Sequence, residues 1–179
     1  MTNSLDSILL TTSLEPLTLK PLSPETQRRL LRFPLSYQED SALLPLEQIG
    51  EVLRVNVANI LPVPEMPSCV LGICNWRGDM LWLVDLSQLL GYLSLDQQGQ
   101  FADVLVVLVV QVNDQSIGLV VSQVNDIEYH NLQHLQPAVT GVFPPKLLPF
   151  ILGSLPDNKG IVLNIHAISH YPLWQIHRG

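Results

Sequence analysis

The stretch that decides the fold is residues 70–86, which read VLGICNWRGDMLWLVDL. The segment from Asn75 to Asp79 carries residues that favour tight turns, and β-branched or bulky apolar side chains flank it on both sides. Two charged residues, Arg77 and Asp85, lie in otherwise apolar surroundings. This arrangement predicts two β-strands joined by a tight turn.

A fainter copy of this hairpin lies near the C-terminus, in residues 151–165. Gly72 of the first hairpin matches Gly153 of the second, and Asp85 matches Asn164. Both matches are separated by a similar distance along the chain, close to half of its length. Self-similarity at a fixed spacing indicates a duplicated structural unit.

A second pair of segments supports the duplication. Residues 49–52 read IGEV and resemble residues 124–127, which read VNDI, and each segment follows an apolar run. The order of apolar strand, acidic-ended strand and Leu-Gly hairpin therefore occurs twice and predicts two related subdomains. We expect the first around residues 43–86, and the second around residues 104–121 together with 150–165.

The composition limits the class of protein. The chain has 179 residues, of which 47% are hydrophobic and 14% are charged, and its formal net charge is −7. A chain with few charges presents apolar patches that can meet other proteins. It lacks the basic footprint that nucleic-acid binding needs. Cys69 and Cys74 should point to opposite faces of one strand, which disfavours a disulfide and fits a reducing compartment.

No segment predicts membrane insertion. Residues 1–10 lack the basic start of a signal peptide. The most apolar stretch, residues 104–112, is too short for a spanning helix, which needs about 20 apolar residues. The polar residues 113–115 interrupt it before residues 117–121 resume the apolar pattern. This pattern predicts a β-hairpin with its bend at Asn113 and Asp114.

Most of the remaining chain has the pattern of short strands. Proline-rich segments at residues 61–67 and 136–149 cannot be regular helix or central strand. A short helical turn is expected at residues 86–90, ended by Gly91. Many short strands with little helix predict an all-β sandwich or barrel. The expected strands lie within residues 30–35, 42–46, 48–55 and 101–127.

Several of these segments resemble the CheW-like family of chemotaxis coupling proteins. The most specific matches are Asn-x-Arg-Gly at residues 75–78 and Val-Asp-Leu at residues 84–86. Residues 48–52 match the family's strand ending in Glu and an aliphatic residue, and residues 106–121 match its second-subdomain hairpin. The resemblance covers residues 29–170.

The resemblance implies an all-β fold of two intertwined five-stranded barrels, each like a Src-homology-3 barrel, with few short helices. It places a single CheW-like domain of two barrels in residues 29–170. A partly disordered extension, residues 1–28, is expected before it, and a tail, residues 171–179, after it.

The resemblance also implies a function without catalysis. CheW-like proteins are adaptors that couple the cytoplasmic tips of chemoreceptors to a CheA-type histidine kinase in chemotaxis, twitching or phototaxis. Such a protein is expected to be cytoplasmic and recruited to membrane-associated receptor arrays, and to bind no nucleic acid, cofactor or metal.

Several residues are expected to bind these partners through charge or an exposed strand. Gly50, Glu51, Val52 and Leu53 are expected to form an exposed strand patch, and by resemblance this patch docks the kinase. Arg77 should project outward from its turn, where its planar guanidinium can bind a partner carboxylate. Three interpretations of Arg77 stay open: a solvated charge, a recognition group, and a surface ion pair with Glu51.

Two tryptophans are further candidates. Trp76 and Trp82 would share a face of a single strand, but the turn at Gly78 interrupts it. Either Trp82 belongs to the core, or at least one of the two anchors a partner on a docking surface. Both also depart from the usual residues of the family, which suggests the branch that serves type IV pilus or phototaxis pathways.

The histidines offer an alternative function. His130 and His134 are four residues apart, as are His166 and His170, a spacing used by zinc-binding helices. The alternative is therefore a small metal-dependent hydrolase. No helix of useful length or third ligand is evident, and no nucleophile elbow or phosphate loop is present. A ligand-binding β-barrel stays open on the apolar content alone.

Overall fold

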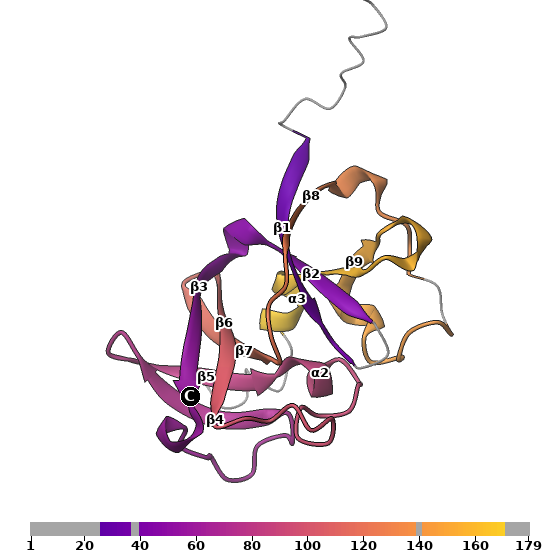
Figure 1. The fold of residues 1–179 in the computed structure, drawn as a ribbon. Helices are drawn as coiled ribbons and strands as arrows, with labels where there is room; N and C mark the ends of the chain where they lie inside the picture. Colours follow the sequence, from indigo (N-terminus) through magenta and orange to yellow (C-terminus); the bar gives the residue numbers. More distant parts are fainter. Residues whose placement is uncertain (1–25, 37–39, 139–140, 171–179) are drawn as a thin grey trace, which may run out of the picture.

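The computed structural model describes residues 26–36, 40–138 and 141–170. They form two five-stranded β-sheets, with short helical turns between several of the strands (Figure 1). The predicted all-β class with two five-stranded units is confirmed. In the part of the chain that the structure describes, no helix is long and apolar enough to cross a membrane.

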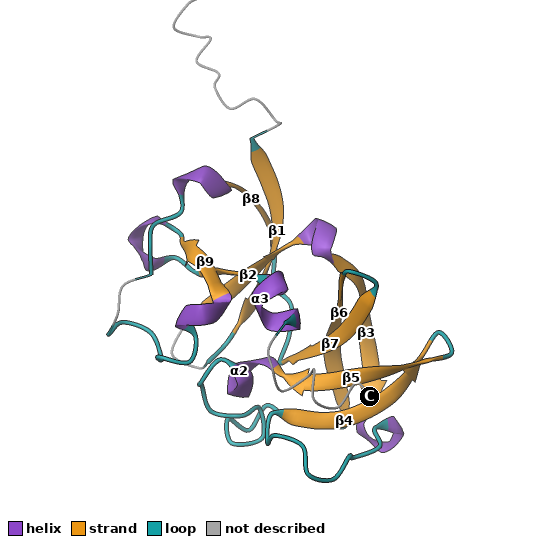
Figure 2. Ribbon diagram, turned by 180° about the vertical axis from the view of Figure 1, so that it is seen from behind, coloured by secondary structure: helices purple, strands orange, loops and turns teal. Residues whose placement is uncertain are grey.

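The strands of both sheets are short, and 3-10 turns or single helical turns separate several of them (Figure 2). The first sheet has the order β3 (Ile49–Asn56), β6 (Val104–Val112), β7 (Gln115–Val121), β5 (Asp79–Asp85), β4 (Val70–Trp76). The second has the order β8 (Ile127–Asn131), β1 (Gln27–Pro34), β2 (Ser41–Pro45), β10 (Ile161–Leu163), β9 (Ile151–Ser154). The α-helices are α2 (Leu86–Leu89) and α3 (Ile165–Ser169), and the 3-10 turns are η1 (Leu46–Gln48), η2 (Val57–Asn59), η3 (Leu132–His134), η4 (Leu148–Phe150) and η5 (Pro156–Asn158).

The two halves of the chain exchange hairpins. Hairpin β1–β2 pairs with β8 and β10, and hairpin β6–β7 pairs with β3 and β5. In Figure 1 the sheet that contains the indigo strand β1 therefore also contains β8 and β9, at the orange-to-yellow end of the colour scale. The expectation that residues 43–86 form one subdomain and residues 104–121 belong to the other is wrong. Residues 41–45 lie in the second sheet, whereas residues 104–121 lie in the first sheet together with β3, β4 and β5.

The exchange preserves the predicted duplication. In the first sheet, hairpin β6–β7 pairs with the edge strand β3 on one side and, in parallel, with β5 of hairpin β4–β5 on the other. In the second sheet, hairpin β1–β2 pairs in the same way with the edge strand β8 and, in parallel, with β10 of hairpin β9–β10. The two helices also start alike. The Asp85 carboxylate accepts a hydrogen bond from the N–H of Gln88 at the start of α2, and the Asn164 side chain accepts one from the N–H of Ala167 at the start of α3.

A shared core holds the two sheets together. The largest cluster of buried side chains includes Phe33 and Leu44 from one sheet and Leu108 and Leu119 from the other. Each fully buried side chain of this kind contributes about 1.5–3 kcal/mol. Separating the sheets would expose this surface, because the two sheets share one hydrophobic core.

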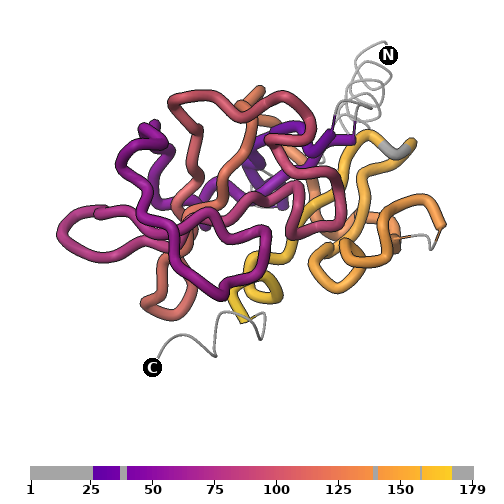
Figure 3. Tube along the Cα trace, turned by 90° about the horizontal axis from the view of Figure 1, so that it is seen from below, coloured from indigo at the N-terminus to yellow at the C-terminus, as the bar shows by residue number. Residues whose placement is uncertain are grey.

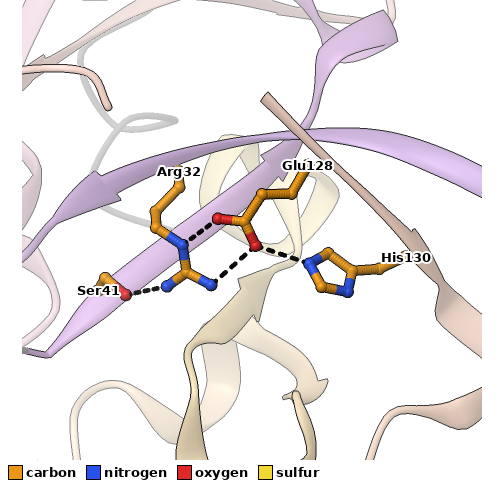
Figure 4. A network of polar contacts seen from close by, with 4 residues as sticks. All are labelled: Arg32, Ser41, Glu128 and His130. Atoms are coloured by element: carbon orange, nitrogen blue, oxygen red, sulfur yellow. Dashed lines mark hydrogen bonds and ion pairs between the residues drawn. The ribbon is translucent and has the colours of Figure 1, made fainter. Parts of the chain in front are cut away.

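A polar network fixes the edge strand β8 against β1 (Figure 4). The guanidinium of Arg32 donates two hydrogen bonds to the Glu128 carboxylate and one to the Ser41 hydroxyl. The His130 Nε2 atom lies 2.8 Å from Glu128 Oε1. The hydrogen bonds from Arg32, with the contribution of His130, lower the pKa of Glu128 to about 2. This carboxylate is therefore charged at neutral pH and bridges the two strands.

Candidate protein-binding site

The turn predicted at residues 75–79 forms the tip of hairpin β4–β5, which extends away from the rest of the molecule (Figure 3). Trp76 pairs with Asp79, and the two residues between them, Arg77 and Gly78, have φ angles of 52° and 85°. Positive φ at both central residues is the mark of a type I′ turn. The Asn75 side chain accepts a hydrogen bond of 3.2 Å from the N–H of Gly78. The turn therefore holds Arg77 at the tip.

Three side chains form a cluster at this tip. The Arg77 guanidinium lies 3.1 Å from the Glu51 carboxylate and, by its Cζ atom, 5.0 Å from the centroid of the Trp76 ring. The Trp76 Nε1–H donates a hydrogen bond of 2.9 Å to the same carboxylate. Glu51 lies on β3 and Trp76 on β4, so the cluster links the two edge strands of the first sheet.

Most of Arg77 remains open to solvent in this cluster. Its side chain is 67% exposed, whereas that of Glu51 is 34% exposed. An exposed ion pair contributes only about 0.2–1 kcal/mol. The guanidinium has five N–H donors in a fixed plane, and the contact with Glu51 joins only one of its terminal nitrogens to one carboxylate oxygen. The other donors of the guanidinium therefore lie outside this ion pair.

The expected strand patch is divided between two faces. Burial alternates along β3, so that Val52 is 48% exposed whereas Glu51 and Leu53 are half-buried on the opposite face. Leu53 packs against the core cluster that contains Cys74 and Leu81. The expectation of one continuous exposed patch is therefore wrong in its geometry, because successive strand residues point in opposite directions.

The two tryptophans also lie on opposite faces. Trp76 shares the face of Cys74, which pairs with Leu81, and packs against that core cluster. Trp82 pairs with Ile73 on the other face of the hairpin and is half-buried. Trp82 is therefore not a member of the core, and the tryptophan that touches core side chains is Trp76.

A groove of about 750 Å³ lies beside this cluster. Leu53, Trp76 and Arg77, three of the residues singled out in the sequence, line it. The other residues that line the groove were not identified from the sequence. Two features of the sequence could have pointed to these residues: the alternation of side chains between the two faces of β3, and the large apolar residues near the proline-rich segment at residues 61–67. These additional lining residues are Arg54, Val55, Asn56, Ala58, Asn59, Leu61, Cys74, Asn75 and Met80.

The paired histidines do not assemble a metal site. His130 is hydrogen-bonded to Glu128, and the ring of His170 lies 2.7 Å from the carbonyl oxygen of His166. Within residues 26–36, 40–138 and 141–170, no group of three His, Cys, Asp or Glu side chains is placed to hold a metal ion.

Comparison with known proteins adds to this geometry. The family model for the CheW-like domain matches residues 29–171, which contain the turn, the cluster and the groove. The chain belongs to the CheW-like family. This assignment agrees with the Asn-x-Arg-Gly segment, which forms the type I′ turn, and with the Val-Asp-Leu segment, whose Asp85 starts helix α2.

Two CheW-like relatives illustrate the similarity. A protein from Rhizobium meliloti (strain 1021) named chemotaxis protein CheW is 36% identical over 76 residues, which are 42% of this chain and 46% of that protein. The match thus spans less than half of the relative's length. The crystal structure of the scaffolding protein TtCheW from Thermoanaerobacter tengcongensis has a TM-score of 0.62 at 21% identity, covering 76% of this chain and 88% of that chain. This second likeness shows a common fold.

Proposed function

We propose that this CheW-like chain is a non-catalytic adaptor that couples chemoreceptors to a CheA-type histidine kinase. The observation that carries the proposal is the Arg77 side chain, which a type I′ turn holds at the tip of a hairpin and which is two-thirds exposed. A fixed guanidinium suits recognition of a carboxylate on another protein, because it can form two parallel hydrogen bonds that Lys cannot reproduce.

The two partners would use different parts of the molecule. The kinase docks on the first sheet, at Val52 on the outer face of β3 and at Arg77 on the neighbouring tip. The tip of a receptor binds between the two barrels. Trp76 supports Arg77 from beneath, and Trp82 offers a half-buried aromatic surface on the other face of the hairpin. The protein works in the cytoplasm, at receptor arrays, without a cofactor.

The proposal is tested by replacing Arg77. Arg77→Ala should lower co-sedimentation with kinase and receptor-containing membranes about tenfold or more, because an Arg anchor in an interface contributes ~2 kcal/mol. Arg28→Ala is the matched control, since Arg28 is an exposed arginine on the second sheet, away from the proposed kinase-docking surface. Normal co-sedimentation of the Arg77→Ala variant would contradict the proposed role.

Thermal unfolding of the same variants separates recognition from bracing. If Arg77 serves recognition, Arg77→Ala should cost less than about 1 kcal/mol of unfolding free energy, as expected for an exposed pair. A larger loss would show that the Glu51–Arg77 contact mainly stabilises the fold. Glu51→Gln refines this result, because Gln keeps an acceptor for Trp76 Nε1–H but removes the charge that faces Arg77.

The kinase-facing side has its own test. Val52→Asp places a charge on an exposed position and should weaken kinase binding, measured by calorimetry, while the unfolding transition stays in place. An unchanged affinity would show that Val52 does not contact the kinase, and would leave the tip of hairpin β4–β5 as the proposed docking element.

A further inference from the structure

The groove beside Arg77 lies between the two edge strands of the first sheet. Strands β3 and β4 are the two ends of the first sheet, and residues of both line the groove. The hydrogen bond between Trp76 and Glu51 crosses from one edge to the other. Edge strands present a row of backbone donors and acceptors that can pair with another chain.

The alternation of hydrogen bonds along β3 shows which of its backbone N–H and C=O groups do not pair with β6. The N–H of Val57 donates to the carbonyl of Asp103, immediately beyond the last pair of the β3–β6 ladder. Because the pattern alternates in antiparallel pairs, the N–H and C=O groups of Val52 and Arg54 point away from β6. In the part of the chain that the structure describes, these groups have no backbone hydrogen-bond partner.

The opposite edge is only partly covered. Ile73 of β4 exchanges hydrogen bonds of 2.8 and 2.9 Å with Leu61, so its backbone groups point away from β5. By the same alternation, the N–H and C=O groups of Asn75, two residues further along β4, point toward the groove. Both walls of the groove therefore carry backbone groups suited to an extended chain.

The side chains of the groove define what it would accept. Leu53, Val55, Cys74 and Trp76 supply apolar surface. The charged side chains among the lining residues are those of Arg54 and Arg77, and no carboxylate lines the groove. Both charges that line the groove are thus positive in a chain whose net charge is −7, although Glu51 pairs with Arg77 beside the groove. Apolar side chains alternating with acidic ones would complement this surface.

We propose that the groove binds an extended peptide segment of another protein, which adds as a strand to the free edge of β3 and places acidic side chains against Arg54 on the outer face of that strand. Strand addition of this kind draws affinity from the main chain and specificity from alternate side chains. The proposal goes beyond the adaptor function, since it requires neither kinase nor receptor, and it can be tested on the chain alone.

The test uses a fluorescein-labelled heptapeptide in which valine alternates with glutamate, and measures its binding to the full chain by fluorescence anisotropy. We expect saturable binding that weakens about tenfold or more when the peptide amides are N-methylated at alternate residues, because the edge bonds are lost. Replacing glutamate by lysine in the peptide should weaken binding by a similar factor.

Protein variants provide the matched comparison. Arg54→Glu should weaken binding of the valine–glutamate peptide about tenfold or more, whereas Arg28→Glu, at an exposed position on the second sheet, should leave it unchanged. Equal binding of the N-methylated or lysine peptide, or no saturation up to about 1 mM peptide, would overturn the proposal.

Amide hydrogen exchange gives a second readout that requires no substitution. Binding of the valine–glutamate peptide should slow exchange at the N–H groups of Val52 and Arg54, because both become hydrogen-bonded to the added strand. Unchanged exchange at both positions under saturating peptide would show that the peptide does not pair with β3 and would overturn the strand-addition proposal.

Discussion

Glu128→Gln tests how much the polar network of the second sheet contributes to stability. The substitution keeps the size of the side chain but removes the charge that faces Arg32, whose own side chain is only 18% exposed. The folded protein holds the pKa of Glu128 near 2, against 4.5 as the ordinary value. Because the folded pKa lies below the unfolded one, the stabilisation is complete above pH 4.5 and is lost as the pH falls toward 2.

The size of the effect follows from the shift. At about 1.4 kcal/mol per pKa unit, the shift corresponds to an upper limit of about 3 kcal/mol. Glu128 remains 27% exposed, and solvent screens part of the interaction. We therefore expect Glu128→Gln to lower the free energy of unfolding by about 2 kcal/mol at pH 7.

Urea unfolding at pH 7 and near pH 2.5 measures this directly. The difference between the original chain and Glu128→Gln should be largest at pH 7 and should shrink by more than half at the lower pH. Asp126→Asn is the matched control, since it neutralises an exposed carboxylate close by in the chain. A cost below about 0.5 kcal/mol at pH 7, or one that does not depend on pH, would refute the argument.

Three further outcomes are expected. Asp85→Ala should destabilise the protein by about 2–4 kcal/mol in urea unfolding, because the N–H groups of Gln88 and Leu95 lose their acceptor, whereas Asp85→Asn keeps a cap and should cost less. Gly72→Ala should cost about 3 kcal/mol or more, because its Cβ would lie 2.2 Å from the Leu61 carbonyl oxygen at a φ of +142°. Metal analysis of the purified chain should find no stoichiometric zinc, and a bound ion would revive the hydrolase alternative.

Local patterns in the sequence predicted the local structure well. The turn at Arg77, the bend at Asn113 and Asp114 and the short helix before Gly91 depend on residues that neighbour one another, and each is present. Both residues of the Asn113–Asp114 bend have positive φ, as a two-residue hairpin turn requires. Such features need no knowledge of the distant chain.

The candidate site was predicted only in part, because its geometry depends on pairing across the chain. The Arg77 turn was evident from the sequence, and Glu51 was named as a possible partner. The opposite faces of Val52 and Leu53 follow from strand alternation, which the idea of a continuous patch ignored. The groove could not be predicted, because it exists only where the edges of β3 and β4 meet.

The repeated Leu-Gly pair has a physical cause that the sequence did not reveal. In the first half, the backbone of Leu61 forms a bridge with Ile73, and its carbonyl oxygen lies where a Cβ on Gly72 would be. In the second half, Gln136 forms the equivalent bridge with Ser154, and its carbonyl oxygen would lie 2.8 Å from a Cβ on Gly153. Each proline-rich segment thus crosses the start of a hairpin so closely that only glycine fits. The sequence similarity between the two halves is therefore strongest where two backbones touch, at Gly72 and Gly153. The hairpins β1–β2 and β6–β7, which exchange between the sheets, have no comparable sequence signal.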